Sequence, residues 1–214
     1  MSAVLRRGIT FCAGLIILCF GIVLNTKTGL GVASINTAPY TFSEVEGISL
    51  GTATMLLYFI FAGVQCLLRR SLGWKIILQI PMSVLIGRIV DFFNDYVLTF
   101  QARSLADGFL LLCCAIPLTA FGTTLVVQTD LVPAAPDGMV RAFGDVMGWD
   151  FGRAKYTFDI IMIVLSAGYA LIRTGHTVGI GVGTVAAALF TGRLCQLFGR
   201  LLAPWFRSCL TKCE

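Results

Sequence analysis

Two arginines lie inside long apolar stretches of this chain, each directly after a glycine. They are Arg88 and Arg193, 105 positions apart. A charged side chain in such a stretch disfavours membrane insertion by roughly 2.5–3.5 kcal/mol and normally faces a cavity or a partner. Two fixed guanidinium groups would bind a carboxylate, phosphate or sulfonate. In the alternative interpretation, Arg88 pairs with Asp91 and Arg193 extends to the membrane surface.

Three aspartates occur in similar surroundings and are candidates for coupling to a cation or proton. Asp91 and Asp159 are predicted ion-coupling residues, and Asp137 is assigned to the substrate site. Burial raises the pKa of a carboxyl group and a nearby arginine lowers it, so such groups can titrate during a transport cycle. The alternatives are an ion pair of Asp159 with Arg153 or Lys155, and helix stabilisation by Asp137.

Two polar inserts, Thr28–Gly47 and Thr129–Gly148, separate apolar stretches and are too polar to cross a bilayer. In the first, Ser34 or Asn36 can cap a short helix near Pro39, and in the second Pro136 suits a first helical turn. Such helices would direct free N–H groups toward the middle of the protein. The predicted substrate site is therefore built from six residues: Arg88, Arg193, Ser34, Asn36, Thr37 and Asp137.

No catalytic residue, metal site or cofactor is predicted. The eight cysteines form no CxxC pair, and His176 is the only histidine. Gly179, Gly181 and Gly183 resemble a dinucleotide fingerprint, but no strand precedes them. Close helix packing through these glycines, or backbone N–H groups that they contribute to the site, are the two interpretations that remain.

The composition is that of an integral membrane protein. The 214 residues are 57% hydrophobic and 13% charged, with a mean hydropathy of +0.88. A helix needs about 20 mostly apolar residues to cross the hydrocarbon core. Six predicted spans meet this requirement: 8–24, 49–68, 74–98, 105–127, 156–172 and one from about 178 to 202. The predicted fold class is thus all-α, a polytopic bundle of six transmembrane helices.

The chain contains an internal repeat. Gly21, Leu24 and Gly51 recur 101 positions later as Gly122, Leu125 and Gly152. Residues 1–214 are therefore predicted to form a single transmembrane domain with repeats at about 8–98 and 105–202, followed by a cytoplasmic tail at 203–214. Three spans per repeat place the second copy upside down relative to the first. This is the inverted-repeat design in which transporters bind substrate near the midplane. Each insert would then supply a short re-entrant or interfacial helix.

The positive charges predict the orientation. Most Lys and Arg residues near span ends fall on the side that holds both termini, which is therefore predicted to face the cytoplasm. The net charge of +5 is explained by this topology and does not require a nucleic-acid partner. The expected partners are membrane lipid and a small ligand, and a homodimer is compatible with so thin a bundle.

Several stretches together are similar to one family. LGVASINTAPY with GISLGTATMLLYF, APDGMVR with FGRAKYTFDI, and the closing VGIGVGT resemble bacterial membrane proteins of the YczE/YyaS/YitT type. The resemblance extends from about residue 8 to 198. It implies a multi-pass protein of the bacterial cytoplasmic membrane and little about chemistry.

Two functions from different classes remain. The first is a secondary transporter or permease for a small anionic or zwitterionic molecule, bound between the repeats. The second is a membrane scaffold or regulator that binds a partner protein through its basic cytoplasmic face and tail. An enzyme is not predicted.

Overall fold

The computed structural model describes residues 3–70 and 73–210, and every regular element within them is helical. The elements are α1 (Ala3–Thr26), α2 (Ser34–Glu46), α3 (Leu50–Arg69), α4 (Trp74–Phe92), η1 (Phe93–Val97), α5 (Leu105–Thr129), α6 (Ala135–Met147), α7 (Phe151–Thr174) and α8 (Val182–Leu210). The prediction of an all-α fold is confirmed.

Six of these helices are long and apolar enough to cross a membrane: α1, α3, α4 with η1, α5, α7 and α8. The third predicted span is continued from Phe93 to Val97 by the π-helical turn η1. The two polar inserts form α2 and α6, of 13 residues each, which is too short for a span of about 20 residues. The protein is therefore a multi-pass membrane protein with two additional short helices.

Both short helices end in the same way, and both are followed by a capped long helix. Gly47 and Gly148 end α2 and α6 in the left-handed conformation, with φ of 67° and 65°, which glycine adopts without steric penalty. Ser49 then caps α3 and Asp150 caps α7 through side-chain oxygens. The members of each pair are 101 positions apart, so both copies build the same turn.

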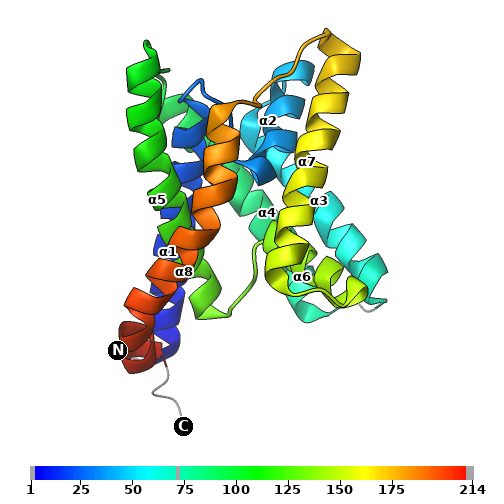
Figure 1. The fold of residues 1–214 in the computed structure, drawn as a ribbon. Helices are drawn as coiled ribbons and strands as arrows, with labels where there is room; N and C mark the ends of the chain where they lie inside the picture. The colour runs from blue at the N-terminus through cyan, green and yellow to red at the C-terminus, as the bar shows by residue number, and fades with distance from the viewer. Residues whose placement is uncertain (1–2, 71–72, 211–214) are drawn as a thin grey trace.

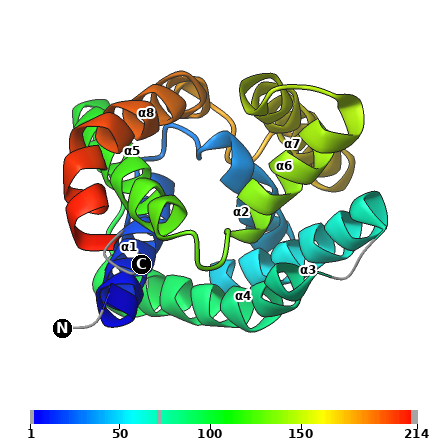
Figure 2. The ribbon, with the colours of Figure 1, turned by 90° about the horizontal axis from the view of Figure 1, so that it is seen from below.

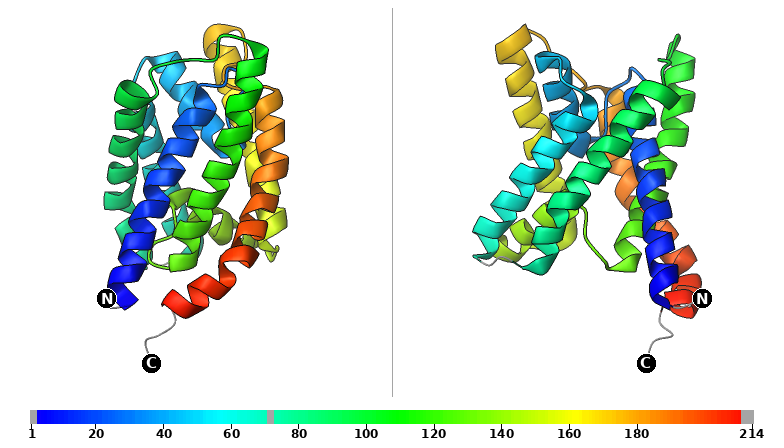
Figure 3. Two further views of the ribbon diagram at one scale, coloured as in Figure 1. Left: turned by 90° about the vertical axis from the view of Figure 1, so that its left-hand side faces the viewer. Right: turned by 180° about the vertical axis from the view of Figure 1, so that it is seen from behind.

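The two copies run in opposite directions (Figures 1 and 3). α1 begins at the side of the molecule where α8 ends, here called the terminal side, and α5 runs the other way. α3 and α7 also run in opposite directions, as do α4 and α8. α2 lies toward the opposite side and α6 toward the terminal side, and both begin near mid-height. Each linker before a short helix therefore turns back toward the middle.

The segment predicted as a tail is largely helical. α8 continues to Leu210, and Phe206 packs against Leu125 of α5. Apolar packing thus extends the last helix beyond the predicted end of the span near 202. Residues 211–214 lie outside the described residues.

Close helix packing holds the centre together. A Cβ atom added at Gly122 of α5 would lie 2.4 Å from the backbone nitrogen of Leu18, and one at Gly21 of α1 would lie 2.7 Å from that of Thr119. Such contacts let α1 and α5 approach closely. α3 and α7 meet in the core through an edge-on contact of Phe61 with Phe158, at 5.4 Å between ring centroids.

Candidate functional site

The predicted residues of the first insert lie buried in the first turn of α2. Ser34, Asn36 and Thr37 are all buried. The Thr37 hydroxyl donates to the Ser34 carbonyl at 2.6 Å and accepts a hydrogen bond from Ser166 of α7 at 3.1 Å. Thr37 therefore joins α2 to α7.

The start of α6 is held in an equivalent place by α3. The Gln65 amide of α3 donates to the Ala135 carbonyl at 3.0 Å and exchanges hydrogen bonds with Gln79 of α4. A Cβ atom at Gly138 would lie 2.5 Å from the Gln65 amide oxygen, so a larger residue at this position would displace the hydrogen-bonded Gln65–Gln79 pair. Because Gln65 and Ser166 are 101 positions apart, as are Thr37 and Gly138, both joints occupy the same place in the repeat.

Polar side chains without protein partners lie around these helix starts. Ser34, Asn36 and Tyr58 are each only 4% exposed, and no hydrogen bond of their side chains is formed within the described residues. No fully enclosed side-chain N or O atom in that part of the chain lacks a partner. The polar atoms of these residues therefore keep a small accessible surface, through which they can bind water or a ligand.

Asp137 lies at the third position of α6 and within electrostatic range of Tyr58. Its carboxylate accepts no hydrogen bond and forms no ion pair among the described residues. Asp137 is half-buried, and the protein packed around its carboxyl removes enough water to raise the pKa. Lys155 and Arg141 lower that pKa, but desolvation is the largest cause.

The two predicted ion-coupling aspartates have protein partners. Asp159 pairs with Lys155 at 3.1 Å, which is the alternative that the sequence left open. Asp91 accepts hydrogen bonds from the Gly51 nitrogen at 2.6 Å and the Ser49 hydroxyl at 2.9 Å. Asp91 thus joins α4 to the start of α3 and does not pair with Arg88.

The predicted convergence of Arg88 and Arg193 is not found. Both side chains are exposed, among exposed apolar neighbours such as Leu85 and Leu197. α4 and α8 lie on different sides of the α1–α5 pair (Figure 2). The structure therefore does not bring these exposed arginines to the buried Ser34, Asn36 and Thr37.

The last long helix of each copy packs differently. In copy one (residues 8–98), α4 lies against α3: a Cβ atom at Gly51 would be 1.9 Å from the Gly87 carbonyl oxygen. In copy two (residues 105–202), the equivalent residues are Gly152 and Gly192. Both are exposed, and a Cβ atom at Gly192 would meet nothing within 4 Å. α8 lies beside α5 and apart from α7 (Figure 2).

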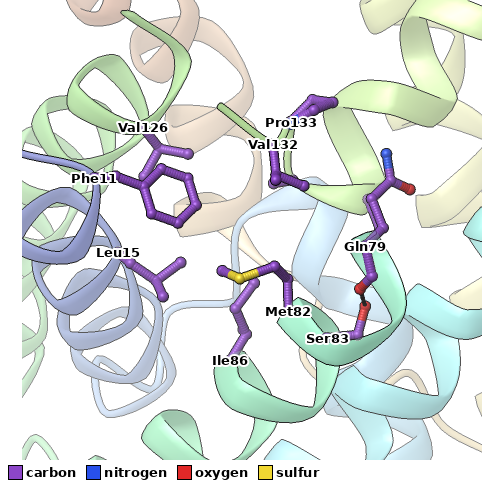
Figure 4. A pocket seen from close by; sticks show the side chains of 11 residues that line it. Phe11, Leu15, Gln79, Met82, Ser83, Ile86, Val126, Val132 and Pro133 are labelled. Carbon is purple, nitrogen blue, oxygen red and sulfur yellow. Dashed lines mark hydrogen bonds between the residues drawn. The ribbon is translucent and has the colours of Figure 1, made fainter. Parts of the chain in front are cut away.

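The contact between the first and the last long helix of the same copy also differs between the copies. In copy two, Leu112 and Ile116 of α5 pack with Ala187 of α8 in a buried apolar cluster. The equivalent residues of copy one, Phe11 and Leu15 of α1 and Met82 of α4, belong to the main apolar core, where they also line a small cavity of about 10 Å³ between the two helices (Figure 4).

This pocket is mostly apolar and leads toward α6. Ile86 of α4, Val126 of α5 and the linker residues 132–134 complete its wall with Ala135, two residues before Asp137. Gln79 and Ser83 also line it, and their side chains are hydrogen-bonded within the protein. The pocket lies in the terminal half of the molecule, beside the start of α6.

The linkers before the two short helices also differ in their backbone hydrogen bonds. Before α2, the Val32 nitrogen donates to the Gly179 carbonyl at 2.8 Å, and the Gly183 nitrogen donates to the Leu30 carbonyl at 2.7 Å. These bonds close the opposite side. Before α6, the residue equivalent to Val32 is Pro133, which has no N–H to donate and lines the pocket.

Fold and site together define a polytopic helical membrane protein whose described residues form six long helices and two short helices, with buried polar side chains at the starts of the short helices, here called the centre. The chain belongs to a family of unknown function, DUF6198, whose model matches residues 5–200. No curated protein and no solved structure matches the chain. In the described residues, no group of three or more His, Cys, Asp or Glu side chains is placed to hold a metal ion.

Tyr58, Gln65 and Gln79 belong to this centre although the sequence analysis did not select them. A signal for Tyr58 was available, because Tyr58 and Asp159 are 101 positions apart. The repeat therefore places a polar side chain at the same point of α3 and α7. The partnership of Gln65 with Gln79 joins two spans and leaves no pattern in the chain.

Proposed function

We propose that this protein is a secondary transporter for a small anionic or zwitterionic molecule, bound between two inverted repeats. The substrate would contact Ser34, Asn36 and Asp137, and neither predicted arginine takes part. Thr37, which is fully buried and bonded to Ser34 and Ser166, holds α2 in place. Inverted repeats with interrupted helices at the midplane are the design in which one half moves against the other around a central site.

The observation that carries this proposal is the unequal packing of equivalent helices. α4 is docked on α3, whereas its counterpart α8 is docked on α5. Exchanging these arrangements would close the pocket beside Leu15 and open the cluster around Ile116. It would also bring Gly192 against Gly152, two positions that already carry glycine. Two related units in different conformations thus supply both end states of an alternating-access cycle.

We infer that the described conformation is closer to the state in which the centre opens toward the terminal side. The backbone bonds of Leu30 and Val32 hold the linker before α2 against the start of α8, whereas the linker before α6 borders the small cavity beside Leu15. The excess of Lys and Arg at the terminal side favours its location in the cytoplasm. The described state would then face inward. The resemblance to proteins of the YczE/YyaS/YitT type further favours a bacterial cytoplasmic membrane.

Thiol labelling of two equivalent positions tests the proposal without a known substrate. Leu15→Cys and Ile116→Cys, each in a variant without native cysteines, are labelled by a membrane-impermeant maleimide in vesicles of known orientation. Leu15 and Ile116 are both buried in the described state, so a transporter, whose helices move apart in turn, predicts that Leu15→Cys reacts from the terminal side and Ile116→Cys from the opposite side. If Ile116→Cys never reacts while an exposed cysteine such as Asp107→Cys does, the protein has one state and the proposal is wrong.

The scaffold hypothesis predicts a different dependence on the last residues. Deletion from Arg207 onward should leave both labelling reactions unchanged in a transporter, because the pocket and the cluster lie elsewhere. A scaffold that acts through this segment would lose its function on the same deletion. It has no need of two accessible states.

A further inference from the structure

The short helices α2 and α6 occupy equivalent positions but carry different charges there. Asn36 of α2 and Asp137 of α6 are 101 positions apart, and each is the third residue of its helix. The first turn of α2 contains no acidic residue, whereas that of α6 contains Asp137. A nearly symmetric backbone therefore presents an asymmetric pair of side chains to the centre.

The α2 end of the centre favours an anionic group. At the start of α2, the Ala33 nitrogen donates to the Asn25 side chain and the Asn36 nitrogen to the Ala33 carbonyl, both at 2.7 Å, while the helix dipole adds a partial positive charge there. No carboxylate in the first turn of α2 offsets that charge. The Ser34 hydroxyl and the Asn36 amide, both on residues only 4% exposed, have no protein partner in the described residues. Together they provide hydrogen-bond donors for a carboxylate.

The α6 end favours a cationic group. The Asp137 carboxylate has no hydrogen-bond or ion-pair partner in the described part of the chain. The nearby Lys155 ammonium contacts both oxygens of Asp159, at 3.1 and 3.2 Å, so Asp159 already balances its charge. The unpartnered Tyr58 hydroxyl lies within electrostatic range of Asp137. The other nearby cation, Arg141, is exposed and lies over the Phe151 ring. An ammonium group at Asp137 would therefore supply the ion-pair partner that this carboxylate lacks.

We propose that the centre binds a small zwitterion, with its carboxylate at the start of α2 beside Ser34 and Asn36 and its ammonium at Asp137. This inference rests on the proposed function, since it names the substrate class of the same site. A ligand with one charge would satisfy one end and leave the other unmatched. A desolvated charge without a partner is strongly unfavourable.

The test measures thermal unfolding of the purified full-length protein with matched probes. Glycine, β-alanine and 4-aminobutyrate are the zwitterions, while acetate, propionate and methylamine carry one charge each. At least one zwitterion should raise the unfolding temperature at a concentration where its singly charged analogues do not. Asp137→Asn and Asn36→Asp should each weaken that binding at least tenfold. Asp145→Asn, on the exposed side of α6 where Asp145 pairs with Arg69, should leave it unchanged.

Three results would overturn the inference. They are the absence of stabilisation by all three zwitterions, equal stabilisation by acetate or methylamine, and unchanged zwitterion binding in Asp137→Asn. Any of them leaves the labelling of Leu15→Cys and Ile116→Cys unaffected. Conversely, if a zwitterion binds but Ile116→Cys is never labelled, the binding site is supported and the transporter proposal is wrong. The two proposals therefore fail separately.

Discussion

Adding one methyl group at Gly87 or at Gly192 should shift the protein in opposite directions. A Cβ atom at Gly87 would lie 2.6 Å from the Gly51 carbonyl oxygen, which is backbone and cannot rotate away. Such overpacking destabilises a state by about 1–3 kcal/mol. Only the described state packs α4 on α3, so Gly87→Ala should favour the other state by about 5- to 150-fold. A Cβ atom at Gly192 meets nothing within 4 Å, so Gly192→Ala should leave the described state unchanged and disfavour the other.

The assay is the rate at which Ile116→Cys is labelled from the opposite side, because that rate follows the fraction of molecules in the other state. Gly87→Ala should increase the labelling rate by up to about 5- to 150-fold. Gly192→Ala should decrease the labelling rate. Thermal unfolding of Gly192→Ala should stay within about 0.5 kcal/mol of the parent protein, as for a surface substitution. If Gly87→Ala lowers the unfolding temperature without changing the labelling rate, the exchange of packing partners is refuted.

Three further substitutions test the centre and its supports. Gln65→Ala leaves the buried Gln79 amide without its partner and should lower the free energy of unfolding by about 1–3 kcal/mol in denaturant titrations. Asp91→Ala removes the acceptor at the start of α3 and should cost about 1 kcal/mol, whereas Asp95→Ala, on an exposed residue, should cost less than half of that. The raised pKa of Asp137 means that the folded state holds this proton more tightly than the unfolded state, so stability should decline as the pH rises above the usual carboxyl value of 3.8. Asp137→Asn should flatten that decline in thermal unfolding between pH 4 and 8, and an unchanged pH profile would contradict the burial of this carboxyl.

The repeat and the two inserts were readable from the chain because glycine, proline and small polar residues recur at a fixed offset. That offset identified the two inserts. Helix-capping residues and proline then predicted a short helix in each, and capping and charge selected Asn36 and Asp137. The predicted convergence of the arginines was wrong because an arginine in an apolar stretch can face either a cavity or the surface of the bundle. Sequence periodicity does not distinguish these outcomes when a helix is apolar on all sides.

The difference between the two copies could not be predicted from the sequence. Gly51 with Gly87 and Gly152 with Gly192 are the same pattern, yet only the first pair is in contact. This difference depends on whether the last helix of a copy packs against the second or the first long helix of that copy, as α4 does on α3 and α8 does on α5. The repeated glycine pattern is compatible with either packing. Pro133, in place of Val32, is the one local signal that the linkers cannot be sealed identically.

Disulfide formation between Gly152→Cys and Gly192→Cys tests the central claim most directly. A disulfide needs Cα atoms within about 7 Å of each other, which requires α8 to leave α5 and dock on α7. The control is Ala120→Cys with the native Cys195, whose sulfur already lies 3.5 Å from the Ala120 carbonyl oxygen. We predict that both pairs cross-link in membranes and that the Gly152–Gly192 cross-link stops labelling of Leu15→Cys from the terminal side. Cross-linking of the control pair alone, under every condition, would contradict the account.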